Sequence, residues 1–266
     1  MKNLKLAAVC LSCLTMTGCS ALNFSVEGLI NAPKLTSEQS EIHQALIESV
    51  GSNITLKYPK NGEYRSAYVI ANIDDEPADE AMVFYEYTSN GSEEDGLRVN
   101  ILDKDEDGKW YSVKELAGAG TDIDQVIISP MGSNNQTDVF VGYQNLTNDE
   151  KTMEIYSYTD GDFKRVALDT YSVLEPLDIN NDGYIELITI QRSTNNDTGA
   201  VTAKASMLNM KNDEITRGEN VDMCDNVTSY VSSKTGMLDS GRRAIFIDGL
   251  TADGKLQTEI IYYRYS

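Results

Sequence analysis

Apolar residues alternate with polar ones, or fall in short runs, over most of the chain after Gly51. A period of two is typical of β-strands, because successive side chains of a strand point to opposite faces of the sheet. The pattern predicts many short strands, separated by turns rich in Asp, Asn and Gly, and therefore an all-β fold. The predicted strands cover residues 54–58, 66–73, 81–87, 97–103, 109–116, 125–130, 138–144, 153–159, 163–168, 184–192, 201–210, 243–250 and 257–265.

Before Gly51 the apolar period is that of an α-helix. Thr36 or Ser37 can act as the N-cap, and Gly51 can end the helix in a left-handed conformation. One face of the predicted helix carries its apolar side chains, which are Ile42, Ala45, Leu46 and Val50. We therefore expect a short N-terminal helix within residues 35–53, followed by a repeat domain over residues 54–266.

A turn followed by an apolar strand recurs four times in this repeat domain. The turns end at positions 80, 138, 186 and 243, so the intervals between them are 58, 48 and 57 residues. A repeat of about 50 residues with four strands in each unit is typical of a β-propeller blade. We expect β-propeller-like repeats of four-stranded antiparallel blades, about four in number, and a β-sandwich is the alternative. A ring usually needs more blades, so either the chain is a truncated propeller or the strand at 54–58 helps to close a small or open arc.

The N-terminus has the features of a targeting segment. Residues 1–19 read MKNLKLAAVCLSCLTMTGC, where two lysines precede an apolar stretch that is too short to span a bilayer. This arrangement resembles a bacterial lipoprotein signal peptide. The resemblance implies a signal peptide over residues 1–18, a diacylglyceryl group on Cys19 and a lipidated tether over residues 19–34. We therefore expect a lipid anchor in the membrane and a location on the extracytoplasmic face of a bacterial cell membrane; a plain secretory signal or a membrane stub is the alternative.

Charge and composition exclude several classes of partner and site. The chain has 42 acidic and 22 basic side chains and a net charge of -20, so we expect no nucleic-acid partner. His43 is the single histidine, which excludes multi-histidine metal sites and argues against a histidine-based triad. We expect it at the surface. Cys224 would be the one thiol left after lipidation of Cys19, so no intramolecular disulfide can form, and we expect Cys224 to be buried and inert.

One turn carries the chemistry of a metal site. Oxygen-bearing side chains stand at alternate positions from 178 to 182 and again at 186, and Gly183 permits a sharp turn. Such oxygens are the ligands that Ca²⁺ prefers. Thr189 stands where an EF-hand would place its Glu, which excludes an EF-hand. The predicted calcium ligands are Asp178, Asn180, Asp182 and Glu186, with a backbone carbonyl near Tyr184.

Other turns keep less of this pattern. In the turn at 72–80 Pro77 replaces the glycine, and we treat this turn as a weaker second calcium site. Its aligned residues are Asn72, Asp74, Glu76 and Glu80. The turn at 130–138 keeps one matching acid and the turn at 235–243 keeps none, which indicates structural turns. Residues 103–110 are acidic but lie between two strands, and we expect a solvated hairpin tip there.

The loop at 178–186 resembles the calcium loop of FG-GAP and VCBS propeller repeats, whose pattern is DxDxDGxx(D/E) before an apolar strand. Residues 35–74 also resemble the opening of VCBS repeat-containing lipoproteins of Gram-positive gut anaerobes, through a helix, an LKYPK strand and a GEYRSA run. The resemblance extends over most of the mature chain. It implies a calcium-loop propeller on a lipid anchor, with Asp178, Asn180, Asp182 and Glu186 as side-chain ligands, and it implies no particular activity.

Three functions are compatible with the sequence. The first is a calcium-stabilised binding or scaffold module at the cell surface, for a protein or glycan partner. The second is an extracellular carbohydrate-active hydrolase that uses paired carboxylates on propeller loops. The third is a purely structural spacer. The chain contains no G-x-S-x-G, H-E-x-x-H, P-loop or dinucleotide motif, which favours binding, and we expect no enzyme activity.

Overall fold

The computed structural model describes residues 35–88, 96–131, 136–145, 150–195, 197–211, 214–225 and 227–264. The chain forms two compact units, Met1–Ser40 and Glu41–Ser266. Cys19 and the predicted tether lie outside the described residues. Helix α2 (Ser37–Val50) begins within the first unit, and every described strand belongs to the second.

Helix α2 begins and ends as the sequence predicts. Thr36 and Gln39 form a capping box, because each side-chain oxygen accepts the backbone N–H of the other residue at 3.1 Å. Gly51 has a φ of 84°, and its N–H donates to the carbonyl of Ile47 at 3.0 Å. No helix among the described residues is long and apolar enough to cross a membrane.

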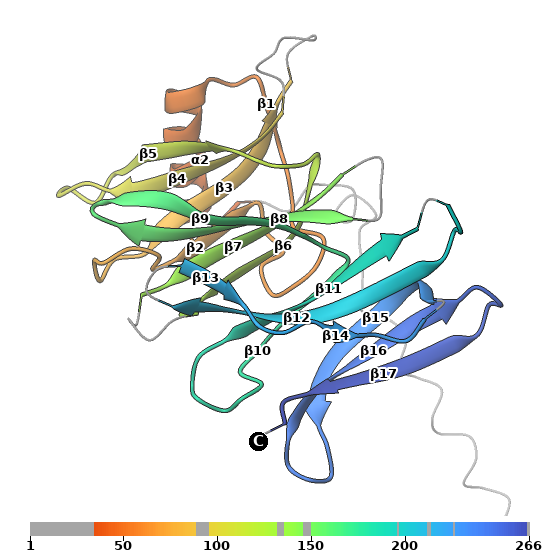
Figure 1. Cartoon of the computed structure of the whole chain (residues 1–266). Helices are drawn as coiled ribbons and strands as arrows, with labels where there is room; N and C mark the ends of the chain where they lie inside the picture. The colour runs from red at the N-terminus through yellow and green to blue at the C-terminus, as the bar shows by residue number, and fades with distance from the viewer. Residues whose placement is uncertain are drawn as a thin grey trace, which may run out of the picture. The chain divides into compact units, whose positions relative to one another are not determined.

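Within the described residues the strands form four antiparallel sheets that follow one another along the chain, which confirms the all-β fold class (Figure 1). The first sheet contains β1 (Ile54–Leu56), β2 (Tyr68–Ala71), β3 (Glu80–Tyr87), β4 (Leu97–Lys104) and β5 (Trp110–Ala117). The second contains β6 (Asp122–Ser129), β7 (Asp138–Gln144), β8 (Lys151–Thr159) and β9 (Asp162–Tyr171). The third contains β10 (Val173–Leu177), β11 (Glu186–Thr194), β12 (Val201–Lys211), β13 (Glu214–Arg217) and β14 (Val221–Asp222). The fourth contains β15 (Val227–Met237), β16 (Arg243–Thr251) and β17 (Leu256–Tyr262).

The four sheets pack face to face in chain order. Phe84 of β3 packs with Val141 of β7 in a core between the first and second sheets. Two further apolar clusters join the second sheet to the third and the third to the fourth. On the other face of the first sheet, Ile42 and Leu46 of α2 pack against Val83. Sheets of antiparallel strands stacked in sequence order are an arrangement like that of propeller blades.

The predicted repeat is confirmed at its turns. The strands β3, β7, β11 and β16 begin at positions 80, 138, 186 and 243. In the first three sheets eight residues precede this strand, at 72–79, 130–137 and 178–185, whereas the fourth turn at 238–242 is shorter. The acid that begins the strand accepts the backbone N–H seven residues before it, and these pairs are Glu80 with Ile73 at 2.8 Å, Asp138 with Met131 at 3.1 Å and Glu186 with Ile179 at 3.1 Å.

Four strands were not predicted, and these are β10, β13, β14 and β15. β15 has the sequence VTSYVSSKTGM, and most of its side chains are exposed or half-buried. β10 contains Pro176, which weakens a strand prediction. β13 and β14 are short and largely exposed. Hydrophobic periodicity detects strands with a buried face, so it missed β13, β14 and β15, whereas Pro176 accounts for the omission of β10.

Two side chains differ from, or refine, the sequence-based expectation. Cys224 is exposed, so the prediction of a buried thiol was wrong. The inward position in this segment is taken by Met223, which is 8% exposed and packs between the third and fourth sheets. Partial desolvation and Glu259 both raise the pKa of the Cys224 thiol, which keeps it a poor nucleophile. His43 is half-buried, and its Nδ1 lies 2.8 Å from the hydroxyl of Tyr68.

Residues 103–110 form the predicted hairpin tip between β4 and β5. The Asp105 carboxylate accepts the backbone N–H groups of Asp107 at 3.0 Å and Lys109 at 2.9 Å. Gly108 has a φ of 77°, which glycine adopts without strain. The acids of this segment therefore serve a turn.

Candidate functional site

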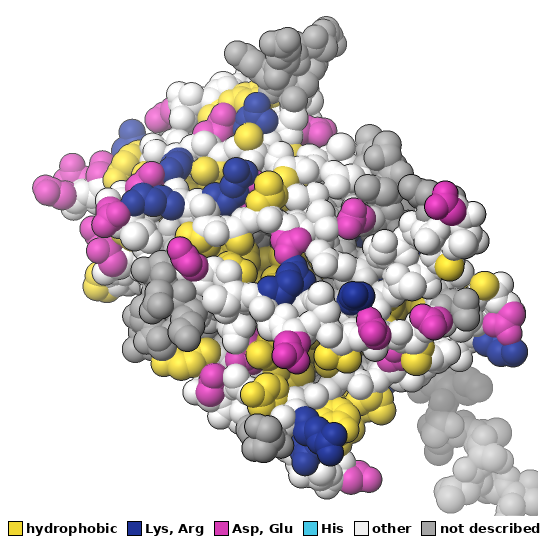
Figure 2. Space-filling view, in the orientation of Figure 1, with side chains coloured by type: hydrophobic (Ala, Val, Ile, Leu, Met, Phe, Trp, Pro, Cys, Tyr) yellow, Lys and Arg dark blue, Asp and Glu magenta, His cyan; other side chains and the backbone are white. Residues whose placement is uncertain are grey.

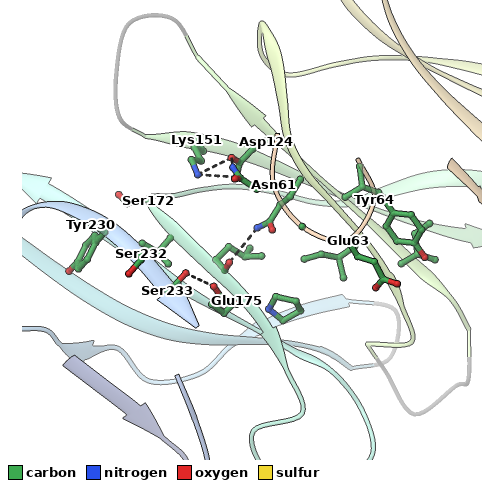
Figure 3. Close-up of a pocket in the computed structure, with 18 of the residues that line it drawn as sticks. Asn61, Glu63, Tyr64, Asp124, Lys151, Ser172, Glu175, Tyr230, Ser232 and Ser233 are labelled. Carbon is green, nitrogen blue, oxygen red and sulfur yellow. Dashed lines mark hydrogen bonds and ion pairs between the residues drawn. The ribbon is translucent and has the colours of Figure 1, made fainter. Parts of the chain in front are cut away.

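A cavity of about 590 Å³ lies within the second unit, a size typical of small-molecule sites. Its walls come from the β1–β2 connection, β6, β8, β10 and β15, so all four sheets contribute to it (Figure 3). The strands β6, β10 and β15 are the first strands of the second, third and fourth sheets. The lining side chains with chemistry of interest are Asn61, Glu63, Tyr64, Asp124, Lys151, Glu175 and Ser233.

A β-bulge places Asp124 in this cavity. Ile123 pairs with Tyr143 and Gln125 pairs with Gly142, which leaves Asp124 without a partner in the β6–β7 ladder. A bulge changes the direction in which a side chain points, and bulges are frequent beside binding sites. The Asp124 side chain is 1% exposed, so its charge needs partners within the protein.

Donors from different parts of the unit surround the Asp124 carboxylate. Asn61 Nδ2 donates to Oδ1 at 2.8 Å. Lys151 Nζ lies 2.9 Å from Oδ1 and 3.0 Å from Oδ2 (Figure 3). The Tyr171 hydroxyl donates to Oδ2 at 2.6 Å, and the Gln144 amide lies 3.4 Å from Oδ1. Both oxygens of this buried carboxylate are therefore occupied by donors.

Backbone contacts tie the same bulge to the neighbouring walls of the cavity. The N–H groups of Lys60 and Asn61 donate to the carbonyl of Asp124 at 3.0 and 2.7 Å. Gln125 Nε2 donates to the carbonyl of Leu174 at 3.3 Å. The β1–β2 connection and β10 are thus held against β6.

Glu175 on β10 faces the same cavity and has a different environment. The Ser233 hydroxyl of β15 donates to its Oε1 (Figure 3). Burial raises the pKa of Glu175, and the hydrogen bond from Ser233 lowers it by a smaller amount. The second oxygen, Oε2, accepts no hydrogen bond from the residues that the structure describes. Glu175 therefore offers an open acceptor to a ligand.

The sequence did not single out Asp124 or Glu175. The strand predicted at 125–130 started one residue too late to include Asp124, and β10 was not predicted at all. A usable signal was the acid between Ile123 and Val126, since an acid enclosed by buried apolar positions needs a specific partner. Glu175 has a similar signal, because it is the one acid among the apolar residues of VLEPL at 173–177.

The predicted calcium loop joins β10 to β11, and the structure brings its polar side chains together. Asn180 Nδ2 donates to Asp182 Oδ2 at 3.0 Å and to Glu186 Oε1 at 2.7 Å. Asp178 Oδ1 accepts the N–H of Asp182 at 3.0 Å, and Asp182 Oδ1 accepts the N–H of Tyr184 at 2.9 Å. The Asn180 carboxamide thus stands between two carboxylates and keeps them together.

The donor set of this loop fits a hard cation because all of its side-chain ligands are oxygens. Gly183 has a φ of 96° and Asn181 a φ of 58°, which together make the sharp turn. Burial, followed by the charges of Asp182 and Asp178, raises the pKa of Glu186 to about 7. Among the described residues, however, no group of three or more His, Cys, Asp or Glu side chains is arranged so that it could hold a metal ion.

The loop at 72–80 differs from the loop at 178–186 because it contains one buried carboxylate oxygen without a partner among the described residues. Glu80 is 1% exposed, and its Oε1 has no hydrogen-bond partner among the described residues, although Oε2 accepts the N–H of Ile73. Burial, followed by the charges of Asp74 and Asp103, raises the pKa of Glu80 to about 7. A cation would satisfy such an orphaned carboxylate oxygen.

The other three predicted ligands of this loop form hydrogen bonds within the turn itself. Asn72 Nδ2 donates to the carbonyl of Glu76, and Asp74 Oδ1 accepts the N–H of Glu76 at 2.8 Å. The structure therefore places Asn72, Asp74, Glu76 and Glu80 in one loop and leaves a single oxygen of Glu80 free of partners within the part of the chain that it describes.

Arg243 occupies the position of the recurring acid in the fourth turn. Its Nη1 donates to the carbonyl of Asp178 at 3.1 Å and lies 3.4 Å from Asp178 Oδ2. The fourth sheet thus supplies a cation to the loop of the third sheet. This contact was not predicted, because a sequence pattern for one turn does not show which turn lies beside it.

No protein-family model matches the chain, and no curated protein matches it. Among solved structures, MPT-4, a mannose phosphorylase from Leishmania mexicana in complex with phosphate ion, is similar over 86% of this chain and 73% of that chain. The two chains share 11% sequence identity, and the TM-score is 0.32.

Gly142 allows the Tyr171 hydroxyl to reach Asp124, because a Cβ atom at position 142 would lie 2.1 Å from that hydroxyl. We expect Gly142→Ala to break this contact and to lower the free energy of unfolding by about 2–3 kcal/mol, as overpacking of a core does. Denaturant unfolding measures the loss. Combining Gly142→Ala with Tyr171→Phe, which removes the clashing hydroxyl, should recover part of it.

Gly218→Ala is the matched control for this prediction, because its Cβ would meet its nearest neighbour at 3.4 Å, an ordinary contact. Equal stability of the Gly142→Ala and Gly218→Ala variants would contradict the role of Gly142.

Proposed function

We propose that this protein is an extracytoplasmic binding module, anchored to the membrane by a lipid on Cys19, which receives a polar part of a glycan or protein partner in the cavity. The observation that carries the proposal is the convergence of polar side chains from all four sheets on one cavity. Most of these side chains are held by other residues before any ligand arrives, and such preorganisation lowers the cost of binding. The lipid anchor rests on the N-terminal sequence alone.

Binding is favoured over hydrolysis by the state of the two cavity carboxyl groups. A hydrolase of glycosidic bonds needs one carboxylate free to act as base or nucleophile and a second carboxyl group as acid. Both oxygens of Asp124 are engaged by Asn61, Lys151 and Tyr171. Asp124 is therefore a support of the cavity wall.

A carbohydrate-active hydrolase is the second candidate, because Asp124 and Glu175 line one cavity and differ in environment. Such a difference is typical of an acid and base pair. Incubation with bacterial glycans, followed by analysis of chain length, separates the two functions. Shortened glycans whose formation requires Glu175 would support the hydrolase.

Calcium has a structural role in this proposal. Asp178, Asn180, Asp182 and Glu186 would hold the ion with a backbone carbonyl near Tyr184, and the bound ion would neutralise their charge. Support comes from the all-oxygen donor set and from the loop that collects it. Glu80 and its loop would hold a second ion more weakly, and support comes from its orphaned buried oxygen.

Calcium should raise the melting temperature of the full chain in detergent. The expected rise is about 5–10 °C at roughly a hundred times the Kd, because a ligand of the folded state alone then stabilises it by about 2.7 kcal/mol. Asp182→Ala should lose most of this rise, and Asp197→Ala, in an exposed turn, should keep it. A wild-type melting temperature that does not change when calcium is added would contradict the ligand assignment.

A bulky side chain in the cavity should remove ligand binding. Ser233 contacts Glu175 inside the cavity, so Ser233→Trp should fill it, whereas Thr258→Trp on exposed β17 should not. We expect glycan-array signals of the wild type to fall at least tenfold for Ser233→Trp and to persist for Thr258→Trp. Signals that survive Ser233→Trp would place the binding site elsewhere.

A further inference from the structure

The charged groups that line the cavity leave an excess of negative charge. Asp124 and Lys151 form an ion pair, so their charges offset each other (Figure 3). The remaining charged residues of the lining are Glu63 and Glu175. Lys151 is the one cation among the described lining residues, and Asp124 holds it. An anionic ligand would therefore meet two carboxylates and no available cation.

Acidic side chains outnumber basic ones over the whole chain, 42 to 22, so the distinguishing feature of Glu175 is its partner and not the excess of negative charge. On the face of the molecule in Figure 2, acidic and basic side chains are interspersed. Several exposed acids elsewhere have basic partners, such as Asp160 with Lys164 at 2.7 Å and Asp253 with Lys255 at 2.5 Å. Glu175 has a hydroxyl group as its partner instead.

Glu175 has the environment of a carboxylate that receives a charged donor. It is half-buried, and burial raises its pKa, so the ionised form lacks part of its hydration. Ser233 supplies one neutral hydrogen bond to Oε1, and Oε2 is open to a ligand. A charge-assisted hydrogen bond from a cation is about twice as strong as a neutral one and offsets this loss of hydration.

We infer that the cavity binds its ligand through a protonated primary amine, which donates to the Glu175 carboxylate. The inference rests on the proposed binding function and names the chemical class of the ligand. An ammonium group has three donors and no acceptor, which suits the open Oε2 of Glu175 in a cavity whose one cation among the described lining residues, Lys151, is paired with Asp124. A cavity of about 590 Å³ accommodates an amino sugar or an amino acid side chain that carries this group.

Three sugars of similar shape test whether the cavity prefers a positively charged ligand to a neutral one. D-glucosamine carries a protonated amine at pH 6, whereas D-glucose and N-acetyl-D-glucosamine are neutral. Calorimetric titration of the full chain in detergent should give a Kd for glucosamine at least ten times lower than for either neutral sugar. In Glu175→Gln, which keeps the shape of the side chain and a partner for Ser233, this ratio should fall below about two, since the charge-assisted bond is lost.

Asp253→Asn is the control, because it removes one carboxylate from an exposed hairpin outside the cavity and should leave the ratio unchanged. Thermal melting checks that both variants are folded. Equal affinities for the three sugars in the wild type would overturn the inference that the ligand carries a protonated amine. The proposed binding function of the cavity would still stand. Failure of glucosamine to bind the wild type, or an unchanged preference in folded Glu175→Gln, would also overturn the inference. Loss of every ligand signal in the glycan array would instead count against the binding function itself.

Discussion

The burial of one carboxylate, Asp124, constrains the rest of the second unit. A buried charge is tolerated only when donors surround it, and breaking such a pair costs about 3–5 kcal/mol. The donors come from the β1–β2 connection, β8 and β9 through Asn61, Lys151 and Tyr171. The backbone carbonyl of the same residue accepts two further N–H groups from that connection. One bulged position therefore fixes how the first and second sheets meet at the cavity.

One set of strands forms the apolar cores between the sheets, and another set borders the cavity. β3, β7 and β11 are buried on both faces and supply the apolar cores between the sheets. β6, β10 and β15 border the cavity, so they carry polar side chains such as Glu175 and Ser233. Bulges in β6 and β15 change the direction of their side chains at the cavity. The core strands β3, β7 and β11 thus contribute most to stability. The strands that border the cavity, β6, β10 and β15, supply the candidate ligand-binding side chains.

This division explains how far the sequence could predict the structure. The buried strands have a strong apolar signal, and the predicted turn ends at 80, 138, 186 and 243 coincide with the first residues of β3, β7, β11 and β16. The strands predicted at 81–87 and 184–192 begin one residue after β3 and two residues before β11. β15 lacks that signal because most of its side chains are exposed or half-buried, and Pro176 weakens the strand signal of β10. Ser233 and Glu175 were missed with these strands. Asp124 was missed because a bulge depends on strand pairing, which local periodicity does not report. The exposure of Cys224 likewise depended on which neighbour, Met223, faces the core.

The recurring turn shows how a repeat can keep its geometry while its chemistry diverges. Glu80, Asp138 and Glu186 all close the turn by the same hydrogen bond to the backbone. That structural role alone accounts for the acid at this position, so calcium requires the additional oxygens found at 178–182. In the fourth sheet Arg243 takes the equivalent position and contacts the neighbouring loop at Asp178. The recurring acid at positions 80, 138 and 186 is therefore explained in part by its hydrogen bond within the turn.

The most direct test of this account is the free energy of unfolding of Asp124→Asn compared with Asp122→Asn, two residues away on the same strand. Asp122 is partly exposed and pairs with Lys57 at 3.6 Å and Lys60 at 2.8 Å, so its replacement should cost less than about 1 kcal/mol. Asp124→Asn should cost about 3 kcal/mol or more, because it removes one partner of a buried ion pair. Equal costs for the two substitutions would contradict the claim that the cavity and the meeting of the sheets depend on Asp124.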